Sequence, residues 1–537
     1  MSTDARGRRL LWSATSGVVG AATFLAVSEL LAVLFARRST PLLAVGSFVV
    51  DVVPRPIKEF AISAFGEADK PVLLGGLAVA AVVVAALAGI LETRRRGLGL
   101  LVFAAATVLA TAAVLTRSGT GALAWIPPVV GGVVGAGVLV LLTSRLRGWA
   151  RLGGRGPAKD ATSAAASDRP SLASDASQPV ARRTFFRVAA IASVGAVLAG
   201  AGAAVLRAGT STIGAVREAL RLPAPRSRVA VPAAAELDIP GLGPLITPNA
   251  DFYRVDTALS VPTIDPSTWR LAVEGLVEQR VELGFDDLVA MGLDEYAITL
   301  TCVSNEVGGE LVGTAVWLGV PVRDVLRLAR PRAGADMVLS RSVDGFTAST
   351  PLSSLTDDGL DAILAVGMNG EPLPLEHGFP VRMVVPGLYG YVSATKWLTE
   401  LRVTRFADDE AYWTPRGYSA RAPIKFSSRV DTPKLGTSVP AGRVPIAGVA
   451  WAQTVGIERV EVRIDDGEWQ EARLAEAINA DTWVQWVLEW DAEPGSHYLT
   501  VRATDRDGRL QVEEPAPIAP DGSTGWQRTL VTVTDGA

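Results

Sequence analysis

The stretch ITLTCVSNEVGG, residues 298 to 309, decides how this sequence is interpreted. Its first half is a short apolar run, which predicts a strand, and its second half is a polar loop with two glycines. Cys302 stands at the junction, where a thiol is placed to face a site rather than a core, and a thiolate is a soft metal ligand. A nucleophilic cysteine would need a base, for which His377 is the candidate in this part of the chain. A lone cysteine is also often a small buried hydrophobic residue, so these alternatives stay open on this evidence.

Cys302 is the only cysteine among the 537 residues. The chain therefore forms no intrachain disulfide, no cysteine-based zinc finger and no iron–sulfur cluster. The only histidines are His377 and His497, which argues against metal sites built from several histidines. Because neither lies in an apolar segment, a bis-histidine haem inside a membrane is excluded.

Two patterns surround this stretch. From residue 249 to about 430, short apolar runs alternate with Gly, Pro and Asp turns, which is typical of an α+β domain. Strands are predicted at 269–273, 298–302 and 381–385, and short helices at 285–291, 321–328 and 351–355. From Val444 the apolar runs are longer, at 457–464, 483–490 and 497–504, with Asp465-Asp466-Gly467 as a hairpin turn. This second pattern predicts a separate immunoglobulin-like β-sandwich.

The N-terminal part is dominated by apolar segments. Hydrophobic residues make up 49% of the chain, and five stretches are long enough to span a bilayer, which takes about 20 residues. They are residues 10–35, 71–91, 98–115, 125–142 and 188–206. Glu29 is the only charged residue within them. A carboxylate inside a membrane suggests a functional role for Glu29. The alternative is that Glu29 lies near a helix end or against a neighbouring helix.

Charge is distributed unevenly along the chain. Residues 1–183 carry 20 Lys and Arg against 10 Asp and Glu, whereas the rest is acidic. An acidic half without a basic cluster argues against a nucleic-acid partner. Arginine clusters at 6–9, 94–96 and 145–155 fall on one side of a bilayer if the N-terminus is cytoplasmic, although the loop expected at 37–70 also holds positive charge. We therefore expect a multi-pass cell-membrane protein whose chain is extracytoplasmic after Leu206.

Before the fifth apolar stretch lies a segment with a signal-like pattern. Residues 148–181 are rich in Ala, Ser, Gly, Pro and Asp, which predicts a flexible linker. Arg182-Arg183 and the Thr-Phe-Phe-Arg that follows resemble a twin-arginine export signal placed inside the chain. A stop-transfer helix with basic flanks is the alternative. Without a clearly placed cleavage site, we expect the stretch to remain as a fifth anchor.

Five segments occur in a recognisable order around Cys302. They are DFYR at 251–254, TLTCVSN at 299–305, MNGEPLP at 368–374, HGFPVR at 377–382 running on to Pro386-Gly387, and SATKWL at 393–398. Together they resemble the sulfite oxidase family of molybdenum enzymes, in which the cysteine of a T-L-x-C-x-x-N segment binds molybdenum. The resemblance extends from about residue 247 to the C-terminus, because the β-module resembles the dimerisation domain of that family.

The resemblance implies a molybdopterin cofactor and a set of site residues. Cys302 would supply the thiolate that binds molybdenum, and Arg254 and Tyr418 would orient the substrate. The pterin and its phosphate would be bound by His377, Arg382 and the segment Ala394-Thr395-Lys396, where Arg and Lys neutralise the anion. Tyr253 and Arg254 would line the same pocket, and Asp344 would contact the pterin. A solvated turn is the alternative for His377 and Arg382.

Departures from the family pattern bear on the substrate. Val303 and Ser304 replace a small pair, Glu306 replaces a basic residue, and Asp256 stands where sulfite oxidases have histidine. Added carboxylates disfavour a sulfite dianion by Coulomb repulsion. The expected substrate is therefore either a small oxyanion such as sulfite or an uncharged sulfoxide, as used by the related periplasmic methionine-sulfoxide reductases.

We therefore predict a multi-domain chain with a transmembrane α-helical bundle, an α+β sulfite-oxidase-type molybdopterin-binding domain and an immunoglobulin-like β-sandwich. The predicted parts are a four-helix transmembrane region at 1–147, a linker at 148–183, a fifth transmembrane helix with the twin-arginine-like signal at 184–207, the catalytic domain at 208–430 and a dimerisation-type domain at 431–537. The predicted function is that of a membrane-anchored extracytoplasmic oxidoreductase, in contact with lipid, that transfers an oxygen atom or two electrons.

Partners and competing functions remain open at this stage. Electrons would pass to or from a separate cytochrome or quinone system, and a homodimer is an open option. One alternative is an exported binding or assembly module that has lost its cofactor. The other is a transport protein with an exported sensor domain, which rests on Glu29 alone.

Overall fold

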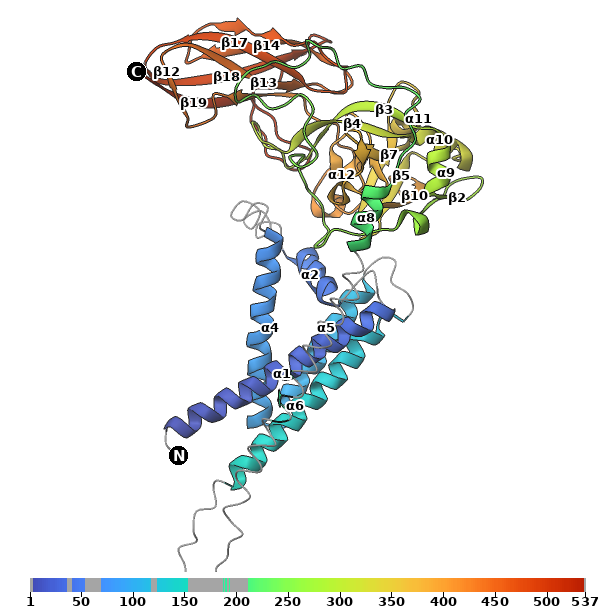
Figure 1. Cartoon of the computed structure of the whole chain (residues 1–537), viewed down its shortest axis with the longest axis vertical. Helices are drawn as coiled ribbons and strands as arrows, with labels where there is room; N and C mark the ends of the chain where they lie inside the picture. Colours follow the sequence, from blue (N-terminus) through green and yellow to red (C-terminus); the bar gives the residue numbers. More distant parts are fainter. Residues whose placement is uncertain are drawn as a thin grey trace, which may run out of the picture. The chain divides into compact units, whose positions relative to one another are not determined.

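The computed structural model describes residues 3–35, 41–53, 69–116, 123–152, 187, 189–190, 193 and 211–535. The chain divides into two compact units, the first comprising residues 1–212 with 258–260 and the second the remainder (Figure 1). The described part of the first unit consists mainly of long helices. The second contains β-sheets and short helices.

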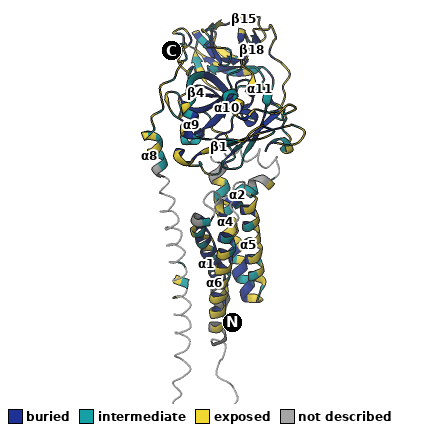
Figure 2. Ribbon diagram, turned by 90° about the vertical axis from the view of Figure 1, so that its right-hand side faces the viewer, coloured by how far each residue is buried: buried dark blue, intermediate teal, exposed yellow. Residues whose placement is uncertain are grey.

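Four helices of the first unit are long and apolar enough to cross a membrane. They are α1 (Thr3–Phe35), α4 (Asp69–Arg94), α5 (Leu98–Leu115) and α6 (Ile126–Leu152). Each coincides with one of the first four predicted stretches. Figure 2 shows many exposed residues along them, and these include apolar side chains such as Val79, Leu101 and Val108. The fifth stretch, the linker and the paired arginines lie outside the described residues, apart from Arg187 and three isolated positions after it.

The segment expected to connect the first two spans, residues 37–70, contains a helix that the sequence analysis did not predict, α2 (Pro41–Val52). The run PLLAVGSFVV is apolar enough to form a helix, but its 12 residues are too few to span a bilayer. Oε1 of Glu29 accepts a hydrogen bond from the backbone N–H of Leu42 at 3.0 Å. This N–H lies in the first turn of α2, where backbone N–H groups have no acceptor within their own helix. Of the two expectations for Glu29, the structure thus shows the contact with a neighbouring helix.

Small residues allow α1 and α4 to approach closely. A Cβ atom at Gly17 would clash with the carbonyl of Ala85, and one at Gly89 would clash with the carbonyl of Ser13. Such packing is typical of membrane helices, whose association depends on van der Waals contact.

The part of the second unit that contains Cys302 has two sheets. Their strand orders are β2-β1-β10-β5-β6 and β3-β4-β7-β8, with β9 beside β7. The strands are β1 (Arg270–Gly275), β2 (Val281–Gly284), β3 (Asp294–Thr301), β4 (Val312–Pro321), β5 (Met337–Ser342), β6 (Thr347–Pro351), β7 (Ile363–Met368), β8 (Glu371–Pro372), β9 (Arg382–Val384) and β10 (Leu398–Thr404). The helices are α8 (Ser211–Ala219), α9 (Phe285–Ala290), α10 (Val322–Ala329), α11 (Leu352–Thr356) and α12 (Gly390–Ser393), with short 3-10 turns at η2 (Pro266–Thr268), η3 (Leu375–His377) and η4 (Thr414–Arg416). Strands β1 and β10 run parallel and their other pairings are antiparallel, in agreement with the predicted α+β organisation.

Local sequence explains the short helices between these strands. In α10, Val322, Val325, Leu326 and Ala329 are buried at helical spacing. In α9, the Asp287 carboxylate accepts a hydrogen bond from the N–H of Gly284 at 2.8 Å, which caps the first turn. The helices predicted at 285–291, 321–328 and 351–355 correspond to α9, α10 and α11, with bounds that differ by one or a few residues.

The C-terminal module, residues 427–534, consists of two packed sheets. One has the order β11-β13-β17-β16 and the other β12-β19-β18-β14-β15. The strands are β11 (Ser427–Thr432), β12 (Ser438–Pro440), β13 (Gly442–Trp451), β14 (Ile457–Ile464), β15 (Trp469–Glu471), β16 (Arg473–Leu474), β17 (Val484–Ala492), β18 (Gly495–Asp505) and β19 (Gln527–Thr534). Residues of both sheets, including Ile446, Trp486, Val462 and Val501, share one core. The predicted turn at Asp465-Asp466-Gly467 joins the antiparallel strands β14 and β15 and is confirmed.

Candidate active site

Cys302 directly follows the last residue of β3 and is 8% exposed. Strand β3 pairs with β4 along its whole length, up to Thr301 opposite Val312. The chain then turns at once, because the N–H of Asn305 donates to the carbonyl of Cys302 at 3.0 Å. Burial raises the pKa of the Cys302 thiol, and the N–H of Ser304, 3.4 Å from Sγ, opposes that effect because it stabilises the thiolate.

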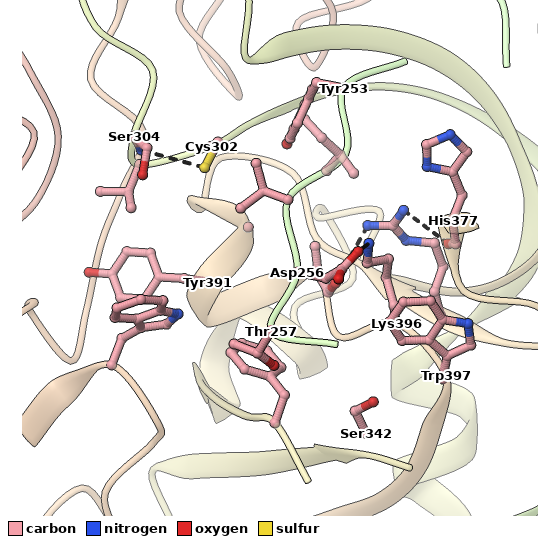
Figure 3. A pocket seen from close by; sticks show the side chains of 18 of the residues that line it. Tyr253, Asp256, Thr257, Cys302, Ser304, Ser342, His377, Tyr391, Lys396 and Trp397 are labelled. Carbon is pink, nitrogen blue, oxygen red and sulfur yellow. Dashed lines mark hydrogen bonds and ion pairs between the residues drawn. The ribbon is translucent and has the colours of Figure 1, made fainter. Parts of the chain in front are cut away.

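A cavity of about 130 Å³ lies in front of Cys302. Figure 3 shows Cys302 and Tyr391 on one side and His377 and Lys396 on the other, with Asp256 between them. Cys302 therefore lines a cavity. Of the residues predicted for the site, those that line the cavity are Tyr253, Cys302, Asp344, His377, Arg382, Ala394, Lys396 and Tyr418.

Two predicted residues are not part of the cavity wall. Thr395 is fully buried, and its hydroxyl forms a hydrogen bond with the hydroxyl of Ser340 on β5 at 2.7 Å. Arg254 is 34% exposed, and its Nε donates to the Asp256 carboxylate at 2.9 Å. Arg254 can therefore act on the cavity through Asp256 rather than by direct contact.

Asp256 and Lys396 form a buried ion pair in the cavity wall. Their side chains are 5% and 9% exposed, and Lys396 Nζ lies 2.6 Å from the Asp256 carboxylate. Burial lowers the pKa of Lys396 to about 8 against the opposing effect of Asp256, so the ammonium remains largely protonated at pH 7.

Contrary to the expectation from the sequence, Asp256 and Glu306 therefore do not add uncompensated negative charge to the cavity. Two cations offset the charge of Asp256, so it is not a bare anion in the cavity. Glu306 is exposed and does not line the cavity, because it lies farther along the loop that follows Cys302.

Arg382, on β9, is a buried cation at the same site. Its Nη1 donates to the carbonyl of His377 at 3.2 Å and its Nη2 to the carbonyl of Ala394 at 3.4 Å. The guanidinium lies over the ring of Trp317, 5.0 Å from the centroid. Burial lowers the pKa of Arg382 to about 10, which leaves it positively charged at neutral pH.

His377 is a neutral hydrogen-bonding group. Burial and the nearby Arg382 lower the pKa of its imidazole to about 4. Its Nε2 lies 3.1 Å from the carbonyl of Asn249, so in the neutral ring Nε2 carries the proton and Nδ1 is an acceptor. The nearby Asp344, in the turn between β5 and β6, is held by hydrogen bonds from the Thr257 hydroxyl at 3.3 Å and the Phe346 N–H at 3.2 Å.

Three aromatic side chains in mutual contact, Tyr391, Trp413 and Tyr418, line the cavity, and of these three sequence reasoning found only Tyr418. The ring of Tyr418 lies 5.5 Å from that of Tyr391 and 5.2 Å from that of Trp413, between centroids. The Tyr391 hydroxyl donates to the carbonyl of Ser419 at 2.7 Å. Tyr391 is two residues before the SATKWL segment and Trp413 five before Tyr418, so their proximity to predicted residues was the available signal.

The donors in this cavity suit an anionic, polar cofactor. Arg382 Nε and Ser342 Oγ are buried, and neither has a hydrogen-bond partner within the described part of the chain. Both residues line the cavity, and a buried polar atom without a partner costs about 1–3 kcal/mol. Among the described residues there is no group of three or more His, Cys, Asp or Glu side chains that could hold a metal ion. The dithiolene of molybdopterin would supply further soft ligands to a metal bound by Cys302.

Comparisons with known proteins agree with this chemistry. Residues 258–413 match the family described as "Oxidoreductase molybdopterin binding domain". Sulfite oxidase of Arabidopsis thaliana is 30% identical over 349 residues, which cover 53% of this chain and 88% of that protein.

Mitochondrial sulfite oxidase of Rattus norvegicus is 33% identical over 339 residues. The match covers 54% of this chain and 62% of the rat protein, so the chain spans less than two thirds of that relative. Among solved structures, the sulfane dehydrogenase SoxCD from Paracoccus pantotrophus superposes with a TM-score of 0.47 at 23% identity, covering 54% of this chain and 81% of that one.

Proposed function

Because the chain belongs to the sulfite oxidase family of molybdopterin oxidoreductases, we propose that it transfers an oxygen atom or an electron pair at a molybdenum centre bound through Cys302. The observation that carries the proposal is the cavity at Cys302, whose lining residues Arg382 and Ser342 each have one buried polar atom, Nε and Oγ, without a hydrogen-bond partner in the described part of the chain. When bound, the molybdenum would supply the oxygen-atom and two-electron chemistry.

The residues of the chain would bind and orient the cofactor. Arg382 and Lys396 would neutralise its negative charge, since both remain cationic at pH 7. His377 would accept a hydrogen bond through Nδ1, and Asp344 would hydrogen-bond to the pterin. Tyr253 would remain protonated, because burial raises the pKa of its phenol, and would act as a donor in the same wall.

For the substrate, the charge pattern favours an uncharged sulfoxide-like compound over a sulfite-like dianion. Arg254 and Lys396 share the carboxylate of Asp256, so their charge is already partly compensated. The wall beside Cys302 is aromatic, with Tyr391, Trp413 and Tyr418 in mutual contact. Such a wall binds apolar groups through contact area. In this proposal Tyr418 orients the substrate directly, and Arg254 acts through Asp256.

The proposal extends to the whole chain. The four apolar helices support a membrane anchor at 1–147, with the linker at 148–183 and a fifth span at 184–207. With a cytoplasmic N-terminus, the catalytic domain at 208–430 and the dimerisation-type domain at 431–537, which contains most of the C-terminal module, would be extracytoplasmic. The two packed sheets of that module suit an immunoglobulin-like dimerisation domain. A cytochrome or quinone system would exchange the electrons.

The experiment that tests this function is metal and pterin analysis of the detergent-purified full chain beside a Cys302→Ala variant. Near-stoichiometric molybdenum and pterin in the unsubstituted chain, with altered molybdenum binding in the variant, is the expected result. Absence of both from protein made in a host that synthesises and inserts the cofactor would instead favour the binding or assembly module.

A further inference from the structure

Strand β3, which leads to Cys302, lies at the edge of its sheet, with β4 on one side. An edge strand presents backbone groups that need other partners. Here the C-terminal module provides them, although it lies more than 150 residues away in sequence. Asn479 Nδ2 donates to the carbonyl of Ala297 at 3.0 Å, and the N–H of Thr299 donates to the carbonyl of Asp481 at 3.0 Å.

Gln453, in the turn after β13, fastens the same strand. Its amide nitrogen donates to the carbonyl of Thr299 and, at 2.9 Å, to the carbonyl of Asp481. The hydroxyl of Thr299 accepts a hydrogen bond from the N–H of Trp483 at 2.9 Å. Both the backbone and the side chain of Thr299, three residues before Cys302, are thus bound to the C-terminal module.

The loop after Cys302 is held by the same module. The Ser523 hydroxyl donates to the carbonyl of Asn305 at 2.7 Å. Arg429 Nη1 donates to the carbonyl of Gly309 at 3.0 Å, while its Nε is fixed by the Asp431 carboxylate at 2.6 Å. The module therefore holds the chain on both sides of Cys302.

We propose that the C-terminal module positions Cys302, with Gln453, Asn479 and Ser523 as positioning residues. The inference rests on the proposed function, since it takes Cys302 as the metal ligand. A side chain binds a metal well only when the groups around it hold it in the right orientation. Loss of such surrounding contacts commonly lowers metal affinity or activity about tenfold or more. The thiol itself is contacted by Ser304, whose N–H lies 3.4 Å from Sγ, and Ser304 belongs to the loop that the module holds. The direction of the thiol therefore depends on where β3 and the following loop are held.

The test uses the fact that Cys302 is the only cysteine, so alkylation of the full chain reports on this thiol alone. Gln453→Met keeps the size of the side chain and removes both hydrogen bonds from its amide. Gln470→Met is the matched control, because Gln470 is exposed on β15 of the same module. In cofactor-free protein we expect Cys302 to be alkylated about tenfold faster in Gln453→Met than in the unsubstituted chain, and at an unchanged rate in the control.

A second readout uses the cofactor-loaded chain. A displaced thiolate alters the g-values of the Mo(V) electron paramagnetic resonance signal, and a role limited to overall stability would leave them unchanged. We expect shifted g-values in Gln453→Met and not in Gln470→Met. If Gln453→Met does not fold, Ser523→Ala makes the same test from the loop side, because it removes only a hydroxyl.

The inference is overturned if both the alkylation rate and the g-values of Gln453→Met and Ser523→Ala match those of the unsubstituted chain. It is also overturned if Gln470→Met shows equal increases. Failure of the proposed function gives a different result, because the unsubstituted chain would then carry no molybdenum while the alkylation rates still report whether the module holds Cys302.

Discussion

Replacing Asp256 by Asn should change both the stability of the second unit and the charge selectivity of its cavity. The Asp256 carboxylate lies 2.6 Å from Lys396 Nζ and 2.9 Å from Arg254 Nε. At an effective dielectric constant of about 20, the attraction to Lys396 is about 6 kcal/mol before desolvation is counted. The attraction to Arg254 is reduced by solvent, because that side chain is 34% exposed. Removal of one partner from a buried pair typically costs about 3–5 kcal/mol.

The expected loss of unfolding free energy for Asp256→Asn is therefore about 3 kcal/mol at pH 7, with the pKa of Lys396 falling below about 8. Sulfate should restore part of this loss in the variant and not in the unsubstituted chain, because it can replace the missing negative charge. The assay is denaturant unfolding of the full chain in detergent, with and without sulfate. Asp507→Asn is the control, because Asp507 forms only an exposed ion pair with Arg509. An Asp256→Asn variant with unchanged stability and no sulfate effect would refute the charge compensation and the substrate preference drawn from it.

Three further predictions concern other parts of the chain. Burial and the nearby Asp361 raise the pKa of Asp481 to about 6. Because the folded state then binds the proton more tightly than the unfolded state, the free energy of unfolding should fall as the pH rises from about 4 to 6. Denaturant titration at several pH values should show that Asp481→Asn removes this slope and adds up to about 3 kcal/mol of stability at pH 7. Gly89→Val should destabilise the helical unit by about 1–3 kcal/mol, measured by detergent-induced unfolding, because its side chain would meet the backbone of α1. Glu29→Ala should cost about 1 kcal/mol in the same assay, because the first turn of α2 loses its acceptor, whereas Glu29→Gln should retain most of the stability.

Local sequence patterns predicted elements that are marked by alternating apolar residues or by a long apolar run. Strand β14 has the predicted bounds, and α5 coincides with the predicted span at 98–115. The helix α2 was missed because its apolar run of 12 residues is too short to span a bilayer, so the segment between the first two expected spans was treated as a loop. Hydrophobic periodicity and composition identify long elements, and they are less informative for an element of only 12 residues such as α2.

The site was predictable only as far as its motifs reached. Motif resemblance placed Cys302, His377 and Lys396 in the correct neighbourhood, and the structure brings them to one cavity. It could not show that Asp256 would be paired with Lys396, because these residues are 140 positions apart and only the fold makes them neighbours. The same reason explains why Trp413 was missed: an aromatic residue without a motif is recognised only when its ring partners are known.

The central claim, that Cys302 binds the metal, is tested most directly by X-ray absorption at the molybdenum edge of the full chain and of a Cys302→Ser variant, each loaded with cofactor. The account predicts one sulfur ligand fewer in the variant, because serine replaces the only cysteine that lines the cavity. An unchanged number of sulfur ligands would contradict it, since the metal would then be held without this thiolate.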